Sequence, residues 1–249
     1  MKIITPNFKV KNIDSQVSFS NDITRASHGL SLVEKRIVML SISKLDSMKP
    51  FLCGESPTVT INAREYADWY NVSINTAYEQ LILASQQFPE RKISFISQKK
   101  YNKDEEKLIP SIRWVKECKY QEGEAWAELV FWHEVVPFLM NLKHNFTTYK
   151  LRDVSKFKSV YTWRLFEILT QYKKSKLIKI SRAEFCNAMD VIDKVNGNFA
   201  YIRSQIIENA IKEIDTEIGW IIKWSAVKTG KKVTGLHFDY SIPPKTILI

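Results

Sequence analysis

Glycine is scarce in this sequence, with only 7 glycines among 249 residues. Loops that cradle the phosphates of nucleotides need closely spaced glycines, as in the patterns GxxxxGK[ST] and GxGxxG. Neither pattern occurs, and Gly230-Lys231 falls in a predicted hairpin turn rather than between a strand and a helix. The sequence therefore has no motif for ATP or for a dinucleotide, and we expect no cofactor.

Residues that bind metals or act as nucleophiles are few and dispersed. The 3 cysteines are odd in number and far apart, which excludes a disulfide framework and a CxxC zinc site. The 4 histidines are isolated and form neither HExxH nor a paired-histidine motif. Asp104, Glu105 and Glu106 are adjacent in one charged run, typical of a solvated loop, whereas a metal-dependent nuclease needs acids from several elements. We expect no metal site, no catalytic residue and no enzyme.

Long hydrophobic runs are missing as well. No apolar stretch of about 18 residues occurs, and residues 1–16 lack the apolar core of a signal peptide. At 45% hydrophobic and 12% aromatic residues, the composition is that of a globular protein. We therefore expect a cytoplasmic protein that does not enter a membrane.

Positive charge is abundant but unevenly placed. Residues 1–145 have 19 Lys+Arg and 17 Asp+Glu, a net charge of +2, whereas residues 146–249 have 18 and 10, a net charge of +8. A surface rich in solubilising lysines is the simplest explanation of such an excess. Its concentration in one part of the chain favours a polyanionic partner, and nucleic acid before membrane.

The pattern on which the interpretation depends is an amphipathic helix predicted over residues 198–218. Apolar residues recur there at spacings of three and four, from Phe199 to Ile218. The polar face of the first half has no acid, whereas the second half has Glu208, Glu213, Asp215 and Glu217. Phosphate would repel the acidic half, so we expect only the first two turns to approach DNA.

The neighbouring segments turn this helix into part of a motif. A short helix is predicted over 182–190, with Ser181 as its N-cap and Glu184 three residues later. After the long helix, strands at 220–227 and 233–242 flank the basic turn KTGKK, residues 228–232. Helix, turn, helix and basic hairpin form the outline of a winged helix, which places the start of its second helix in the major groove.

The first half repeats this order. VTINAREYADW (59–69) matches IKISRAEFCNA (178–188) at a constant offset of 119 residues. Each copy follows a long amphipathic helix and precedes a turn, a second helix and a strand hairpin. We predict an α+β protein of two tandem winged-helix domains, 1–145 and 146–249, with the more basic second domain as the main DNA-binding domain.

Further elements are predicted from periodicity and capping signals. Helices are expected at 31–45, 62–69, 74–88, 138–143 and 156–172. Strands are expected at 59–61, 91–97, 112–120, 125–132 and 177–180.

Side chains that could contact DNA follow from these placements. On the predicted recognition helix they are Asn198, Tyr201, Arg203, Ser204 and Gln205. In the wing and along the backbone they are Lys228, Lys231, Lys232, Lys150, Arg152, Lys156 and Lys158. The equivalent helix of the first domain opens with Asn75, Thr76 and Tyr78. The alternative is a core helix with a solvated face and ordinary surface lysines; on a helical wheel Arg203 even points into the apolar arc.

Three stretches resemble the iteron-binding replication initiators of theta-replicating bacterial plasmids. They are HGLSLVEKRIVMLSISKLD (28–46), FTTYKLRDVSKFKSVYTWRLFEILTQYK (146–173), and IRSQIIENAIKEI (202–214) followed by KTGKKVTGLHFDY (228–240). Where many members have a second basic residue after Arg203 and a proline before Ala210, this chain has Ser204, Gln205 and Asn209.

The resemblance implies two winged helices. The second reads directly repeated origin sites in double-stranded DNA, and the first, 1–145, adds auxiliary DNA contacts and forms the dimer interface. It implies that monomers bind these repeats and help to open the duplex, in equilibrium with homodimers that repress the initiator's own promoter at an inverted repeat. The host replication initiator and helicase would be partners, and no catalytic step is implied. A winged-helix transcriptional regulator without a replication function is the alternative, and an enzyme ranks third.

Overall fold

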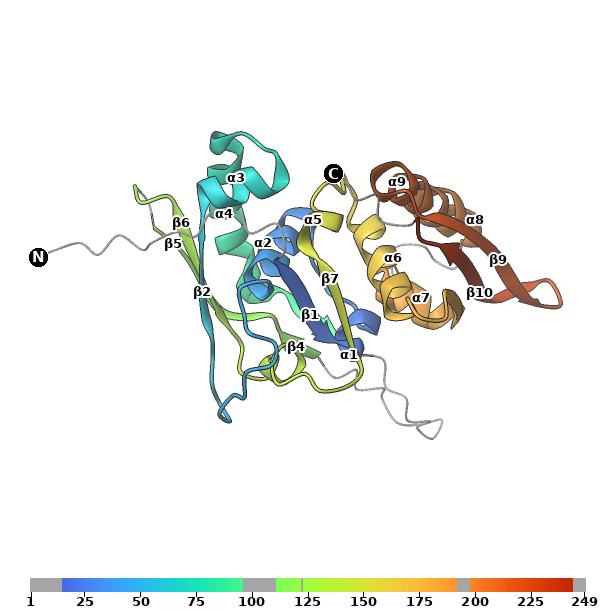
Figure 1. Cartoon of the computed structure of the whole chain (residues 1–249), viewed down its shortest axis with the longest axis horizontal. Coiled ribbons are helices and arrows are strands. Elements are labelled where there is room, and N and C mark those ends of the chain that lie inside the picture. Colours follow the sequence, from blue (N-terminus) through green and yellow to red (C-terminus); the bar gives the residue numbers. More distant parts are fainter. Residues whose placement is uncertain (1–14, 96–110, 122, 192–197, 244–249) are drawn as a thin grey trace, which may run out of the picture.

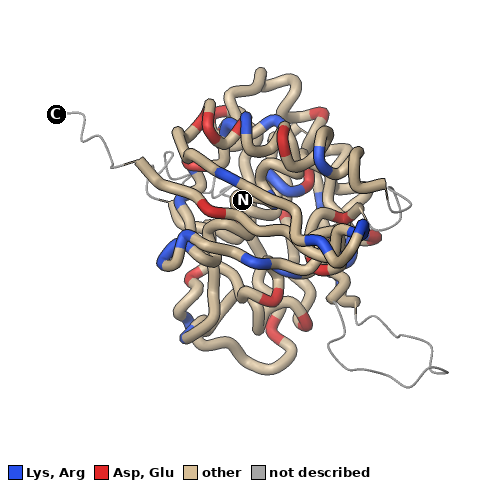
Figure 2. The backbone as a smooth tube through the Cα atoms, turned by 90° about the vertical axis from the view of Figure 1, so that its right-hand side faces the viewer, with Lys and Arg blue, Asp and Glu red and all other residues tan. Residues whose placement is uncertain are grey.

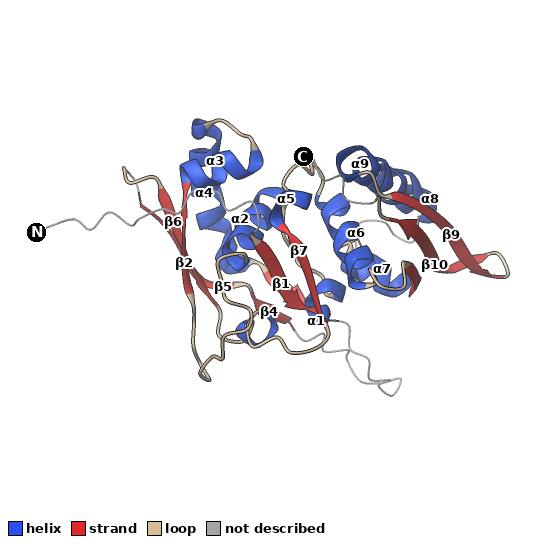
Figure 3. Cartoon of the chain, viewed as in Figure 1, coloured by secondary structure: helices blue, strands red, loops and turns tan. Residues whose placement is uncertain are grey.

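The computed structural model describes residues 15–95, 111–121, 123–191 and 198–243. Two sets of helices and strands lie one after the other along the longest axis of the molecule (Figure 1). Each set has a three-stranded antiparallel sheet with helices packed against it, as the colouring by secondary structure shows (Figure 3). We call them the first and the second winged-helix unit.

The first unit is built on helix α2 (Leu32–Ile42), strand β2 (Thr58–Asn62), helices α3 (Ala63–Tyr70) and α4 (Ile74–Gln87), and strands β5 (Val115–Gln121) and β6 (Trp126–Phe131). The short strands β3 (Lys92–Ser94) and β4 (Ser111–Arg113) pair with each other between α4 and β5. Ser31 caps α2 in a capping box with Glu34, and Asn62 caps α3, because their oxygens accept the free N–H groups of the first turn.

The second unit repeats this order with helix α6 (Val160–Gln171), strand β8 (Leu177–Ser181), helix α7 (Arg182–Ala188), a long second helix over 199–218, and strands β9 (Ile221–Thr229) and β10 (Lys232–Ser241). The strand orders are β2-β6-β5 and β8-β10-β9. In both units the last strand along the chain therefore lies in the centre of the sheet, between the first strand and the second. Equal order and equal topology confirm the prediction of two winged helices related by an internal repeat.

A separate two-stranded sheet joins the start of the chain to its middle. Strand β1 (Gln16–Ser20) pairs antiparallel with β7 (Phe146–Lys150), followed by the short helices α1 (Asn21–Arg25) and α5 (Leu151–Val154), respectively. Residues just after position 145 therefore share a sheet with the N-terminal segment. The division of the chain at residue 145 stays a prediction. The strand that follows it pairs with β1 and, through the Tyr149 hydroxyl, bonds to Glu167 and Trp163.

A buried polar cluster joins the two units. The Arg164 guanidinium donates to the carbonyls of Thr24 and Ala26 at 2.8 and 2.7 Å and, on the other side, to the Ala188 carbonyl at 2.8 Å. The Glu167 carboxylate accepts from Arg164 at 2.7 Å and from Lys35 at 2.9 Å. The charged side chains of Arg164, Glu167 and Lys35 thus all have partners within the protein, which is the condition under which buried charges are tolerated.

Asp190 adds a second link across the junction. Its carboxylate accepts the backbone N–H of His28 at 3.1 Å and of Gly29 at 3.2 Å, and it also accepts the Ser27 hydroxyl. Asn187, in α7, donates to the Arg25 carbonyl at 3.1 Å. The end of α7 is thus fastened to the segment that connects α1 with α2.

The predicted elements agree with the structure except at a few places. The helix expected at 138–143 is wrong: a 3₁₀ turn, Val136–Phe138, is found instead, and Asn141 has a positive φ that ends helical winding. The helix expected from residue 156 begins at Val160, because Ser159 is its N-cap. The charged run 99–107 and the loop 192–197 lie outside the described residues. No helix in the described part of the chain is long and apolar enough to cross a membrane.

Candidate nucleic-acid interface

The predicted recognition helix is continuous but not uniform. It begins as α8 (Phe199–Tyr201), continues as the π-helical segment η3 (Ile202–Glu208) and ends as α9 (Asn209–Ile218), where Gly219 adopts a positive φ. Asn198 is the N-cap, and its side-chain oxygen accepts the N–H groups of Ala200 and Tyr201 at 3.1 and 3.3 Å. Asn198 therefore serves the helix itself in this state.

One face of this helix is firmly held. Ile202, Ile206, Ile207, Ala210 and Ile214 are buried against the rest of the unit. Glu213, in the predicted acidic half, accepts the Lys158 backbone N–H at 2.6 Å and the Thr162 hydroxyl, which fixes α9 to the start of α6. This acid therefore has a structural function, and it lies in the half of the helix that we expect to stay away from DNA.

The opposite face of the first half is open to solvent. Tyr201, Arg203, Ser204 and Gln205 are all exposed. Ser204 donates to the Ala200 carbonyl at 3.0 Å, and the Gln205 amide reaches only the Ser204 hydroxyl at 3.3 Å. Side chains whose bonds are short-range and solvent-exposed are free to exchange them for acceptors and donors on base edges.

The helical wheel places Arg203 in the apolar arc, but in the structure its side chain does not point into the core. Its side chain is 61% exposed, and its Nε lies 2.7 Å from Oε1 of Glu208. The wheel assumes 3.6 residues per turn, whereas a π-helical turn closes bonds from i to i+5 and is wound more loosely. The π segment rotates Arg203 out of the apolar arc, and nothing in the local sequence announces this turn.

The wing follows directly after the recognition helix. Strands β9 and β10 pair antiparallel: Ile221 lies opposite Ser241 at one end, and Thr229 lies opposite Lys232 at the other. Gly230 has φ +60° in the tight turn between them. Lys228, Lys231 and Lys232 are exposed at this tip. Figure 2 views this end of the molecule and shows Lys and Arg positions along the strands that cross its middle.

The other residues predicted to contact the DNA backbone lie in the segment between the units. Lys150 is the last residue of β7, and Arg152 lies in α5, where its Nε is 3.8 Å from Oδ1 of Asp153. Lys156 and Lys158 are exposed before α6. Lys156 and Lys158 line a cavity of about 510 Å³ between the units.

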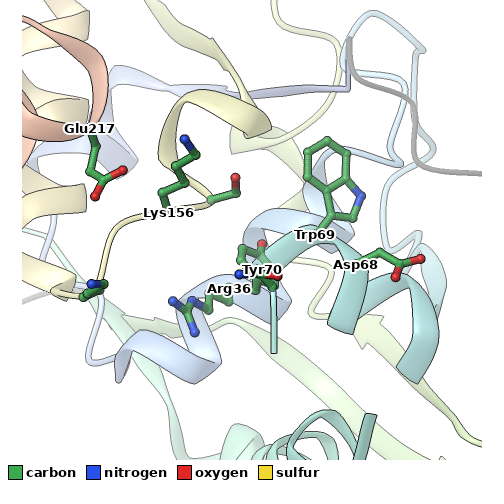
Figure 4. Close-up of a pocket in the computed structure, with 9 residues that line it drawn as sticks. Arg36, Asp68, Trp69, Tyr70, Lys156 and Glu217 are labelled. Carbon is green, nitrogen blue, oxygen red and sulfur yellow. The ribbon is translucent and has the colours of Figure 1, made fainter. Parts of the chain in front are cut away.

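Figure 4 shows that cavity. Arg36 and Tyr70 lie together on one side, and Lys156 and Glu217 come from other segments. The guanidinium carbon of Arg36 is 5.1 Å from the Tyr70 ring centroid, a cation–π distance, and Arg36 also donates to the Phe157 carbonyl at 3.1 Å. The cavity therefore has charges of both signs, and the Arg36 guanidinium at its edge already has protein partners.

In the first unit the equivalent helix is α4. Ser73 caps it and accepts the Thr76 N–H at 3.1 Å. Asn75 is exposed, whereas Thr76 and Tyr78 are half-buried, so only Asn75 is as open as its counterparts in the second unit. The two predicted sets of base-contact residues thus lie at equivalent positions of the repeat. The set in the second unit is the more accessible to solvent.

Shifted pKa values concentrate at the junction. Burial, followed by the charges of Arg164 and Lys35, holds the pKa of His28 well below its usual value. Burial lowers the pKa of Lys35 to about 8, although the Glu167 carboxylate opposes that shift. His28 is therefore neutral at pH 7, with Nε2 donating to the Ile23 carbonyl at 2.8 Å. Burial raises the pKa of the Cys118 thiol to about 12, the opposite of what a nucleophile needs.

Within the described ranges, no group of three or more His, Cys, Asp or Glu side chains is arranged to hold a metal ion. The accessible polar chemistry lies instead on the recognition helix, the wing and the segment between the units. Amide, hydroxyl and guanidinium groups beside a lysine-rich hairpin bind and orient a polyanion.

Comparison with known proteins agrees with this geometry. The family described as "Initiator Replication protein, WH1" matches residues 16–170, and "Initiator Rep protein, WH2" matches residues 181–240. An Escherichia coli "Uncharacterized 27.6 kDa protein" is 26% identical over 232 residues, which cover 90% of this chain and 94% of the relative. An Escherichia coli "Replication initiation protein" is 24% identical over 235 residues, 92% of this chain and 71% of the relative.

A solved structure has the same architecture. The "Crystal structure of Pi initiator protein in complex with iteron DNA" superposes with a TM-score of 0.74 at 20% identity and covers 94% of this chain and 99% of that one. At this identity the likeness establishes the fold. Together with the two family matches, which span both winged-helix units, it leads to one conclusion: the chain belongs to the initiator replication protein family.

Proposed function

We propose that this protein initiates plasmid replication by binding repeated origin sites, or iterons, in double-stranded DNA. The observation that carries the proposal is the exposed, acid-free first half of the recognition helix directly before a lysine-tipped wing, in a chain of the initiator family. In a winged helix these two parts contact base edges and backbone phosphates, respectively. The Pi initiator, which shares the fold, was crystallised with iteron DNA.

Base reading is assigned to Asn198, Tyr201, Arg203, Ser204 and Gln205. Backbone contacts are assigned to the wing lysines Lys228, Lys231 and Lys232, and to Lys150, Arg152, Lys156 and Lys158 between the units. The first unit adds a weaker contact through Asn75, Thr76 and Tyr78. We assign no catalytic step to the protein.

Membership of the family supports a proposal for the wider functions. We propose that the bound monomer promotes opening of the origin and recruits the host replication initiator and helicase in the cytoplasm. A homodimer formed through the first unit, 1–145, would repress the protein's own promoter at an inverted repeat.

Binding to the direct repeats of the plasmid that encodes the chain tests the proposal. Fluorescence anisotropy should be measured with a duplex of those repeats and with a shuffled duplex of equal composition, at physiological salt. We expect the repeats to be preferred by at least roughly 10³-fold. Equal affinity for the two duplexes would refute the proposal. Binding of promoter DNA without any binding of the repeats would identify a transcriptional regulator instead.

A further inference from the structure

The exposed ion pair on the recognition helix exists because of the π-helical segment. Arg203 and Glu208 are five residues apart, and in a regular α-helix only residues three and four apart are neighbours. The i to i+5 closure of η3 brings the Glu208 carboxylate to 2.7 Å from Arg203 Nε. The same turn moves Arg203 out of the apolar arc. Single π turns in helices are frequent at functional sites.

Both partners lie on the solvent side of the helix. The side chains of Arg203 and Glu208 are 61% and 43% exposed, so the pair contributes little to folding. Its position is what distinguishes it, because it lies between the acid-free first half and the acidic second half. Glu208 is the first acid that DNA would meet along this face.

We propose that Glu208 is a positioning and specificity residue for DNA. It holds the Arg203 guanidinium at the exposed surface through the bond from Nε to Oε1, and releases it only to a DNA acceptor that offers two hydrogen bonds in exchange, such as the O6/N7 edge of guanine. Where the base offers no such pair, Arg203 stays with Glu208, and the carboxylate repels the nearby phosphates. Non-specific DNA is thereby bound less well than the lysine content of the unit alone would permit. The inference rests on the proposed function, since it concerns the same helix.

Asp215 offers a matched control. It lies seven residues after Glu208, two turns along the same helix, where α-helical rise places it about 10 Å farther along the axis. Asp215 is exposed and has no side-chain ion pair among the described residues. Glu208→Gln and Asp215→Asn remove the same charge, but only the first frees Arg203.

The experiment measures the ratio of affinities for the repeat duplex and the shuffled duplex, using the full chain. Glu208→Gln should strengthen binding to the shuffled duplex and lower the ratio by roughly 1.5- to 5-fold, the worth of an exposed ion pair. Asp215→Asn should shift both affinities alike and leave the ratio unchanged. In an Arg203→Ala background, Glu208→Gln should no longer change the ratio.

Two outcomes would overturn the inference: an equal change of the ratio in Glu208→Gln and Asp215→Asn, or an effect of Glu208→Gln that persists without Arg203. Either outcome leaves the proposed function intact as long as the unaltered protein prefers the repeats. If the unaltered protein shows no preference, the proposed function fails first, so the two failures are distinguishable.

Discussion

The two winged-helix units share a topology but present different surfaces on the helix that enters DNA in this fold. In the second unit this helix exposes Arg203, Ser204 and Gln205 and is followed by a lysine-tipped hairpin. In the first unit, α4 has no Lys or Arg and exposes Ile82 and Leu83, the latter to 51%. The two units therefore have the same fold, and their side chains determine which of the two surfaces suits phosphates and bases.

Helix winding adds to the difference. α4 is α-helical over its 14 residues, and its buried Ala77, Leu81 and Ala84 follow the regular spacing. The second unit's helix has the π turn that exposes Arg203 and pairs it with Glu208. This difference supports our proposal that the second unit makes the main base contacts and the first unit only auxiliary ones.

The largest expected effect concerns what joins the units. Arg164→Ala removes the guanidinium that bonds to carbonyls of both units and leaves Glu167 and Lys35 with an incomplete buried cluster. We expect a loss of about 3–5 kcal/mol in the free energy of unfolding, measured by urea denaturation. Lys173→Ala, at an exposed position after α6, should change it by less than about 0.5 kcal/mol. Similar values for the two variants would show that the junction does not hold the units together.

The second effect compares the two base-reading helices directly. Gln205→Ala should relax discrimination at one base pair of the repeat, at about 1–3 kcal/mol. Asn75→Ala, at an exposed position of α4, should cost less than Gln205→Ala in the same assay. Binding to a set of repeats with single base-pair changes gives both values. A larger cost for Asn75→Ala would reverse the assignment of the two units.

The third effect is a pH dependence of stability that arises at the junction and not on the recognition helix. The pKa of His28 is lowered in the folded state, so below the ordinary value of 6.5 the unfolded chain binds a proton that the folded chain does not. Stability should therefore fall as the pH drops below 6.5, by up to about 1.4 kcal/mol per pH unit from this group. Unfolding free energies at pH 7 and 5.5 test this. His28→Asn should make the free energy of unfolding less dependent on pH in this range. An unchanged pH dependence in this variant would contradict the assignment to His28.

The smallest effect concerns the wing. Lys231→Ala should weaken binding to every duplex and reduce the slope of log K against log salt by roughly one unit. Lys116→Ala removes an exposed lysine from β5, the outer strand of the first unit, and should leave the slope unchanged. If both variants reduced the slope equally, the two hairpins would contribute alike to the phosphate contact.

Much of the fold could be read from local patterns. Ser31 with Glu34 and Ser181 with Glu184 both form the capping boxes that their spacing predicts. The match between 59–69 and 178–188 at a constant offset identified the repeat, because each copy encodes the same strand, cap and helix. The exposed lysines of the KTGKK turn could be located in the same way.

Three features were decided by tertiary structure alone. The pairing of β1 with β7 and the bonds of Arg164 to Thr24 and Ala26 join residues more than 120 positions apart, and periodicity carries no information about such partners. The π turn depends on how the helix packs, and it places Arg203 outside the apolar arc in which a regular helical wheel puts it. Caps and amphipathic spacing act within a few residues, so most of the elements and their repetition follow from local sequence patterns. Pairing over long distances and side-chain exposure depend on the assembled core, and only the tertiary structure settled them.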